Sequence, residues 1–159
     1  MYLRQGQLVG KEGSMETGYV SLTAEEARDK ILAGELNFKR ALIVGDLDLA
    51  DLEIDGELEL DGATIEGSLN LSGASIGGSL LLQEAEVVGS INLQNAIIDG
   101  DLQLGWASVE VDIILVRVSV MGFIDLSFEK GPQSIFVHDD MAESIHYAAP
   151  TTPLVVCPR

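Results

Sequence analysis

The 159-residue sequence predicts an all-β fold, a right-handed parallel quadrilateral β-helix with about 22 residues per coil. A short capping helix is expected before this solenoid and a capping segment after it. Two features predict the solenoid: an 11-residue repeat and the spacing of acidic residues along that repeat. The composition agrees, because 47% of the residues are hydrophobic but only 5% are aromatic, which suits thin layered packing.

Glycine marks the repeat. The markers stand 11 residues apart, with valine in one slot: Gly45, Gly56, Gly67, Gly78, Gly89, Gly100, Val111 and Gly122. Leucine or isoleucine follows at the second and fourth positions, a small residue at the seventh, and isoleucine or valine at the ninth. The unit G-x-L-x-L-x-x-A-x-[IV]-x therefore recurs seven to eight times within residues 41–127, which is the signature of a repeat architecture.

Each repeat predicts two short strands joined by corners. The L-x-L and A-x-I segments each place two apolar side chains on one face, which is strand periodicity. The extra residue between Leu71 and Ala74 breaks the alternation, so the chain has to turn there. At the other junction the marker glycine is expected to adopt conformations that are costly for residues with a Cβ.

Two repeats per coil give four faces, with Leu-Leu faces alternating with Ala-Ile faces. Stacked strands bring equivalent residues about 4.8 Å apart, where like charges repel. A coil of 11 would place Asp46 against Glu57, and a coil of 33 would place Glu66 against Asp99. A coil of 22 places no acid against another acid within the repeats.

A meander of hairpins is the alternative architecture. Its turns would fall at Ser72-Gly73, Gln83-Glu84 and Gln94-Asn95. Only the first is a plausible turn dipeptide, and none is the preferred Asn-Gly or Asp-Gly. The turn chemistry therefore favours the β-helix.

The segments 63–65 (Ala-Thr-Ile) and 74–76 (Ala-Ser-Ile) resemble the A-[DN]-L-x-x unit of the pentapeptide-repeat family, whose members are right-handed quadrilateral β-helices. Residues 43–127 are also similar to L-x-L-x-x-A-x-V-x-G-x-L-x-L stretches of bacterial proteins labelled membrane-associated oxidoreductase. The resemblance implies the fold. It also permits one activity, because some pentapeptide-repeat proteins act on DNA gyrase through acidic rods shaped like a duplex.

Residues 1–20 are expected to form a flexible arm and residues 21–40 a helical cap. Thr23 can cap the helix while Glu26 returns the bond, and Gly34 is a good stop. The helix should lie over the first coil with an apolar stripe made of Ala24, Ala27, Ile31 and Leu32.

The repeat loses its polar outer face near its end. Trp106, Ile114 and Phe123 stand in outward slots, which suggests that something covers them. We expect residues 128–159 to be a C-terminal cap or dimerisation segment, folded back on the last coils or docked on a second copy. A short helix is expected within residues 138–150.

The formal net charge of −17 repels nucleic acid and anionic membranes and favours cationic partners. We therefore expect no direct nucleic-acid binding, and the apolar positions are too regularly interrupted for a membrane span. The single cysteine, Cys157, excludes an internal disulfide and fits a reducing compartment. With no signal peptide in residues 1–14, a cytoplasmic location is expected.

No residue pattern predicts catalysis, a cofactor or a metal. His138 and His146 are expected to be surface or capping residues, because a metal site needs three or four convergent ligands. Paired acids such as Asp46 and Asp48 would lie on a convex face without a cleft. Cys157 has no neighbouring base, and no G-x-x-x-x-G-K-[ST] or helix-opening G-x-G-x-x-G motif occurs.

These observations predict a non-enzymatic structural or interaction protein that binds an unknown protein partner, or a second copy through its C-terminal region. The alternative is a DNA-mimicking inhibitor or protector of a DNA-binding enzyme such as gyrase. The charge fits this alternative and the resemblance permits it.

Overall fold

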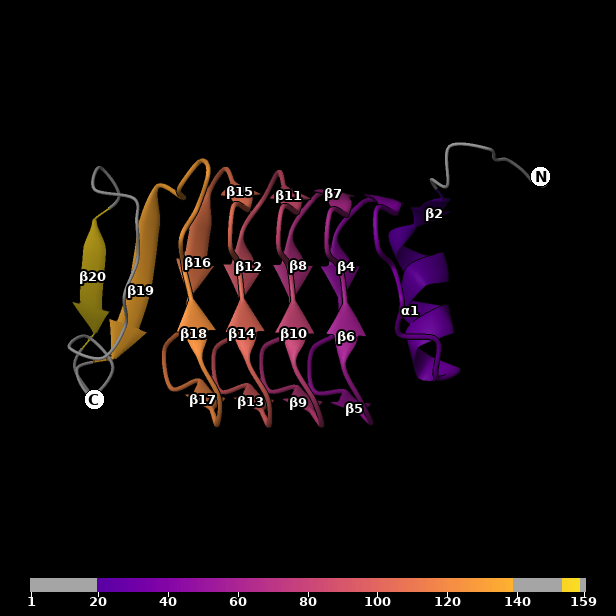
Figure 1. The fold of residues 1–159 in the computed structure, drawn as a ribbon, viewed down its shortest axis with the longest axis horizontal. Helices are drawn as coiled ribbons and strands as arrows, with labels where there is room; N and C mark the ends of the chain where they lie inside the picture. Colours follow the sequence, from indigo (N-terminus) through magenta and orange to yellow (C-terminus); the bar gives the residue numbers. More distant parts are fainter. Residues whose placement is uncertain (1–19, 139–152, 158–159) are drawn as a thin grey trace.

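The computed structural model describes residues 20–138 and 153–157. It is a parallel β-solenoid with one helix at its N-terminal end (Figure 1). The predicted arm, residues 1–20, lies outside the described residues except for Val20. The helix expected within residues 138–150 also lies outside them, apart from His138.

Four walls of short strands enclose the interior, and each is named here by number. Wall 1 contains β2 (Ser21–Thr23), β3 (Leu42–Val44), β7 (Thr64–Glu66), β11 (Glu86–Val87) and β15 (Ser108–Val109). Wall 2 contains β4 (Leu47–Asp48), β8 (Leu69–Asn70), β12 (Ile91–Asn92), β16 (Asp112–Ile114), β19 (Ser134–His138) and β20 (Leu154–Cys157). Wall 3 contains β5 (Glu53–Ile54), β9 (Ser75–Ile76), β13 (Ile97–Ile98) and β17 (Ser119–Val120). Wall 4 contains β6 (Leu58–Glu59), β10 (Leu80–Leu81), β14 (Leu102–Gln103) and β18 (Ile124–Asp125).

The register confirms a coil of 22 residues. Leu47 pairs with Leu69, and Leu69 pairs with Ile91, all in parallel. Asp48 consequently lies beside Asn70 rather than beside another acid. The spacing that avoids stacked acids is the spacing that the protein adopts.

The interior is a column of aliphatic side chains. Within one repeat, Leu69, Leu71, Ala74 and Ile76 are all fully buried. The Leu-Leu segments lie on walls 2 and 4 and the Ala-Ile segments on walls 1 and 3, so the predicted alternation of faces is confirmed. Each added coil covers the apolar surface of the previous one, which is how a repeat protein gains its core.

The structure corrects the prediction for the marker glycines. Left-handed backbone recurs at the other corner, directly before the small residue of each repeat, at Arg40, Asp51, Gly62, Gly73, Glu84, Asn95, Trp106 and Arg117. Gly45 has φ +107°, but later markers such as Gly78 lie outside the left-handed region. A Cβ on Gly78 would stand 2.9 Å from the backbone nitrogen of Glu57 in the preceding coil. The markers are glycine chiefly because neighbouring coils approach closely there.

The N-terminal end is covered by α1 (Ala24–Leu32). The capping box is present as predicted: Glu26 N donates to Thr23 Oγ1 at 3.1 Å, and Thr23 N donates to Glu26 Oε1 at 2.9 Å. Ala27 and Ile31 are buried against the first coil, whereas Leu32, expected in the stripe, is 55% exposed. A strand, β2, precedes the helix and pairs with β3, so the stack begins before the cap.

The C-terminal segment extends the stack instead of covering its outer face. β19 pairs with β16 and β20 pairs with β19, so wall 2 has six strands, whereas seven to eight repeats at two per coil predict about four. Among the described residues, walls 3 and 4 end at β17 and β18. Trp106, Met121 and Phe123 remain 68%, 73% and 81% exposed, so the described tail does not cover them.

Candidate interaction surfaces

Polar side chains at two corners link successive coils. At the corner between walls 1 and 2, Ser68 N donates to Asp46 Oδ1 at 2.8 Å, and Ser90 N donates to Ser68 Oγ at 3.0 Å. The corner between walls 3 and 4 has the same ladder, in which Asp101 N donates to Ser79 Oγ. Because corner amides lie outside the strand pairing, these side chains satisfy donors that would otherwise lack a partner.

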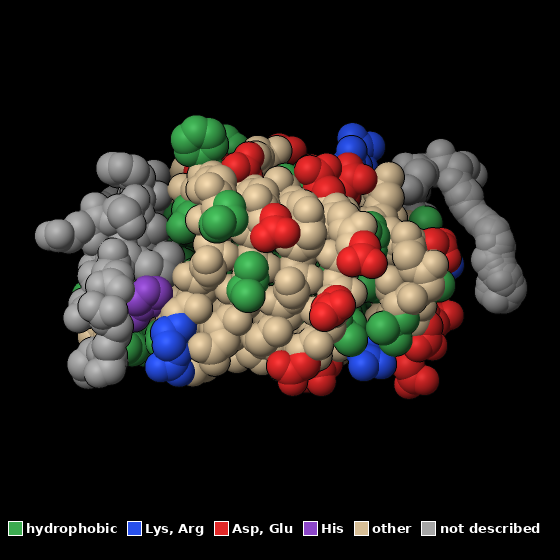
Figure 2. Space-filling view, turned by 90° about the horizontal axis from the view of Figure 1, so that it is seen from below, with side chains coloured by type: hydrophobic (Ala, Val, Ile, Leu, Met, Phe, Trp, Pro, Cys, Tyr) green, Lys and Arg blue, Asp and Glu red, His purple; other side chains and the backbone are tan. Residues whose placement is uncertain are grey.

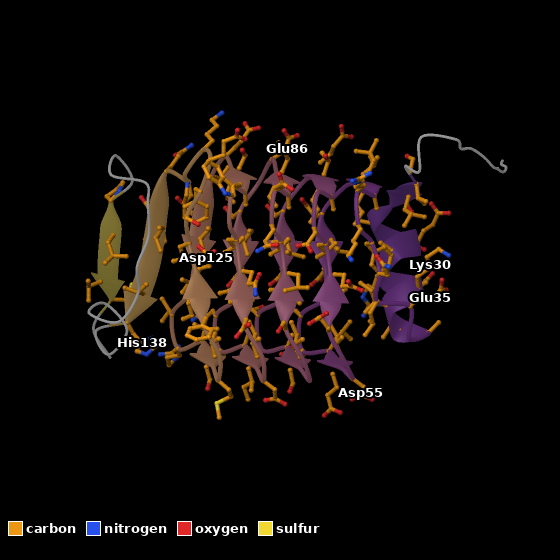
Figure 3. All side chains as sticks on the ribbon, viewed as in Figure 1. Lys30, Glu35, Asp55, Glu86, Asp125 and His138 are labelled. Carbon is orange, nitrogen blue, oxygen red and sulfur yellow. The ribbon has the colours of Figure 1, made fainter. Side chains whose placement is uncertain are left out.

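The first coil carries a ring of carboxylates, the acid belt. It consists of Asp46, Asp48, Asp51, Glu53, Asp55, Glu57, Glu59 and Asp61. The first six of these are exposed, and Figure 3 shows Asp55 pointing away from the stack. Residues 41–116 contain fifteen acids and no lysine, arginine or histidine, so the belt dominates the field over this half of the molecule.

The corner between walls 3 and 4 changes character along the stack. Its successive coils present Asp-Gly-Glu at 55–57, Gly-Gly-Ser at 77–79, Asp-Gly-Asp at 99–101 and Met-Gly-Phe at 121–123. We call Met121 and Phe123 the apolar corner. Figure 2, which views wall 3 from outside, shows hydrophobic side chains near the β17 end of this face beside carboxylates.

The apolar corner stacks on the segment of the preceding coil that carries Asp99 and Asp101. Phe123 N donates to Asp101 Oδ1 at 2.8 Å, and Met121 N donates to Ile98 O at 3.0 Å. Asp101 therefore stands below Phe123, and Asp99 stands below Met121. An exposed aromatic ring and an exposed thioether lie one coil away from two negative charges.

Trp106 occupies a separate position on the corner between walls 4 and 1. Its φ is +61°, and its side chain is 68% exposed. Trp106 N donates to Ser127 O at 2.6 Å, so the next coil fixes the backbone of this corner. Its exposure makes Trp106 a second apolar point on the outer surface, separated from the apolar corner by wall 4.

The N-terminal end has a shallow hollow of about 170 Å³, lined by Val20, Leu22, Lys30, Glu35, Asn37, Phe38, Lys39 and Ala41. Its charges are paired: Lys30 Nζ lies 3.7 Å from Glu35 Oε1, and Lys39 Nζ lies 3.0 Å from Glu59 Oε1. Lys30 and Glu35 lie side by side at the helical end in Figure 3. The hydrogen bond to Glu59 and the charge of that carboxylate raise the pKa of Lys39, so this amine is no general base at neutral pH.

The residues considered for chemistry do not converge. His138 Nδ1 accepts a hydrogen bond from Arg117 N at 2.7 Å, whereas His146 lies outside the described residues. Cys157 is half-buried in β20, and Asp46 and Asp48 accept hydrogen bonds at corners. Within residues 20–138 and 153–157, no three His, Cys, Asp or Glu side chains are grouped to hold a metal.

The sequence analysis identifies an apolar outer face but misses the acids next to it. Phe123 and Met121 stand out as apolar residues in polar slots, and their position over Asp99 and Asp101 follows when the chain is aligned at 22 residues. Asp-Gly-Asp followed 22 residues later by Met-Gly-Phe was the available signal.

Comparisons with protein-family models, with curated proteins and with solved structures found no match to this chain. The structure itself places the chain among parallel β-solenoids built from repeats. In the part of the chain that the structure describes, no helix has the length and hydrophobicity needed to cross a membrane.

Proposed function

We propose that this protein is a non-enzymatic interaction protein, a rigid solenoid related to the pentapeptide-repeat family that presents its outer surface to a protein partner. The observation that carries the proposal is the outer surface itself. The interior repeats the same aliphatic pattern from coil to coil, but the outside changes from an acid belt to an apolar corner. Such variation is not needed to hold the stack together, so it is available for recognition.

Crosslinking of the full chain in its native cells, followed by reconstitution with each purified crosslinked protein, tests the proposal. We expect a complex of fixed stoichiometry whose crosslinks map to outward residues. Failure of every candidate to form a complex contradicts the proposal. So does stoichiometric flavin or nicotinamide absorbance in the purified chain, since that indicates redox chemistry.

The fifteen acids without a cation over residues 41–116 support a second candidate, mimicry of DNA toward an enzyme such as gyrase. A duplex carries one charge per ~1.7 Å along its whole axis. Here eight of the fifteen acids encircle a single coil. Along the stack, the corner between walls 3 and 4 changes from Asp55 and Glu57 in that coil to Met121 and Phe123 in the last. This distribution favours the interaction role over mimicry.

A supercoiling assay with purified gyrase separates the two candidates. Mimicry predicts inhibition or protection that weakens when Asp55→Asn and Glu57→Gln remove two belt charges. An absence of any effect at high protein concentration removes the mimicry proposal and leaves the interaction role in place.

A further inference from the structure

We propose that the apolar corner, together with Asp99 and Asp101, binds a basic amphipathic segment of a partner protein, one that carries arginine or lysine beside apolar side chains. This inference rests on the proposed interaction role and names the chemistry of the partner.

The first support is that the fold does not require apolar residues at this corner. The equivalent positions in earlier coils hold Asp55, Gly77 and Asp99 below Met121, and Glu57, Ser79 and Asp101 below Phe123. The polar residues serve the ladder, since Ser79 and Asp101 each accept the amide of the following coil. The side chain of Phe123 has no acceptor, so it cannot serve the ladder. Its ring is 81% exposed, so it adds little to the core either.

The second support is the charge around the apolar corner. The nearest charged side chains on the same corner are Asp99 and Asp101, one coil or about 4.8 Å below. Asp99 is exposed, and its carboxylate makes no hydrogen bond or ion pair with any described residue, although its backbone N donates to Ile76 O at 3.0 Å. The nearest arginine in sequence, Arg117, lies at another corner, where its Nε donates to Asn95 Oδ1 at 3.0 Å. A ligand here meets negative charge that no described cation neutralises.

Arginine and lysine match this pairing of groups. A guanidinium can stack on the face of Phe123 while it donates to Asp99 or Asp101, and an adjacent apolar side chain can cover Met121. The cation–π contact with Phe123 and the charge-assisted hydrogen bond to a carboxylate therefore both favour a cationic side chain at this corner. Thioether side chains such as Met121 also adapt to varied partner shapes.

A second copy of this chain fits the apolar corner poorly. A two-fold contact would bring two Asp99-Asp101 pairs together between chains that each carry a net charge of −17. Facing carboxylates this close are only partly screened at physiological salt, where the Debye length is about 8 Å. Electrostatics therefore selects a cationic partner over self-association.

Two synthetic peptides with the same leucine positions, one carrying arginine and the other glutamate at the polar positions, are the probes. Peptide binding to the full chain is measured by fluorescence anisotropy. We expect the arginine peptide to bind and the glutamate peptide not to bind. Met121→Ser with Phe123→Ser, and separately Asp99→Asn with Asp101→Asn, should each raise the Kd about tenfold or more, as expected at a hot spot.

Matched controls distinguish this site from general attraction to an acidic protein. Asp55→Asn with Glu57→Gln removes two charges from the same corner in the first coil, and Val44→Ser with Val88→Ser removes two exposed apolar residues elsewhere. Each control should change the Kd less than about twofold. Methyl NMR provides a local readout, because Met121 is one of four methionines and its signal should shift on binding.

Equal loss of binding in the site variants and the controls overturns the inference, as does a Met121 signal that stays fixed. Concentration-dependent dimerisation without peptide, abolished by Met121→Ser with Phe123→Ser, also overturns it, because the occupant is then a second copy. If both site variants form the reconstituted native complex with unchanged affinity, this corner is not the binding site, but the proposed interaction role still stands.

Discussion

The first coil (42–63) and the fourth coil (108–129) follow the same path through four walls, yet they present different outer surfaces. The first coil carries the acid belt, whereas the fourth carries Met121 and Phe123 at the corner where the first has Asp55 and Glu57. The backbone accepts either set, because these side chains point away from the core. The comparison teaches that the interior specifies the fold and that the exterior is free to specify a partner.

The two coils also differ inside. Leu58 of the first coil is fully buried. Ile124, which holds the same position on wall 4 of the fourth coil, is only partly buried. Wall 4 ends at β18 among the described residues, so no described strand covers Ile124 from the following coil. In the first coil, the segment 36–38 covers wall 4 from the N-terminal side and β10 covers it from the other. In the fourth coil, wall 4 is covered by a described strand on one side only.

The largest expected effect tests this difference in burial. Leu58→Ala should lower the free energy of unfolding by about 2–5 kcal/mol, because it leaves a cavity in a packed column. Ile124→Ala should cost clearly less, because its side chain is already partly exposed. Urea denaturation of both variants measures the two losses, and equal losses would break the comparison.

The next effect concerns the close approach of coils at the marker glycines. Gly78→Ala places a Cβ 2.9 Å from the backbone nitrogen of Glu57, which has to move, at a cost of about 1–3 kcal/mol. Gly105→Ala is the matched control, because its new Cβ meets a side-chain oxygen of Asp125 at 3.2 Å, and that side chain can shift. Thermal or urea unfolding should rank the variants in this order. The reverse order would mean that the spacing between coils relaxes easily.

A smaller effect is expected from the corner ladder beneath the apolar corner. Asp101→Ala removes the acceptor of the Phe123 amide and should cost about 1 kcal/mol. Asp101→Ser should restore most of this loss, because Ser79 Oγ plays the same role one coil earlier. Equilibrium unfolding of the pair tests the ladder, and identical values for alanine and serine would mean that water satisfies this amide.

The smallest effect concerns Lys39, which pairs with the belt carboxylate Glu59. The folded pKa of Lys39 is raised above its usual value of 10.5, first by the hydrogen bond to Glu59 and then by the charge of Glu59. Its contribution to stability is complete below the unfolded pKa and is lost as the pH rises through the folded pKa. The unfolding midpoint should therefore fall slightly in alkali.

Lys39→Arg is the control for the alkaline loss, because guanidinium keeps its charge there. Urea midpoints measured from about pH 9 to about pH 12 should fall less in this variant than in the wild type. Parallel curves would assign the loss to other groups.

Most of the solenoid could be predicted from the sequence because its information is local and periodic. The spacing of Leu69, Leu71, Ala74 and Ile76 defines two strands and a corner, and the remaining repeats show the same spacing. The capping box at Thr23 and Glu26 is equally local. Handedness stays a prediction, although right-handed crossovers are the rule for parallel strands.

Other features could not be predicted, because they depend on contacts between coils. The spacing of the glycines correctly predicts that they lie at corners, but glycine is needed there because the preceding coil is close, as Glu57 is to Gly78. The left-handed residues include Trp106 and Arg117, which carry no turn signal of their own. Neighbouring coils hold these residues in a conformation that their own preferences disfavour.

The sequence by itself determined the coil length, the four walls and the aliphatic interior, because a repeat with a fixed period has only one register that buries its apolar residues and separates its acids. Tertiary structure alone decided how the stack ends, with β19 and β20 extending one wall while Met121 and Phe123 stay exposed over Asp99 and Asp101. The physical reason is that each coil is shaped by its neighbours, and the last coils lack the neighbours that make the middle regular.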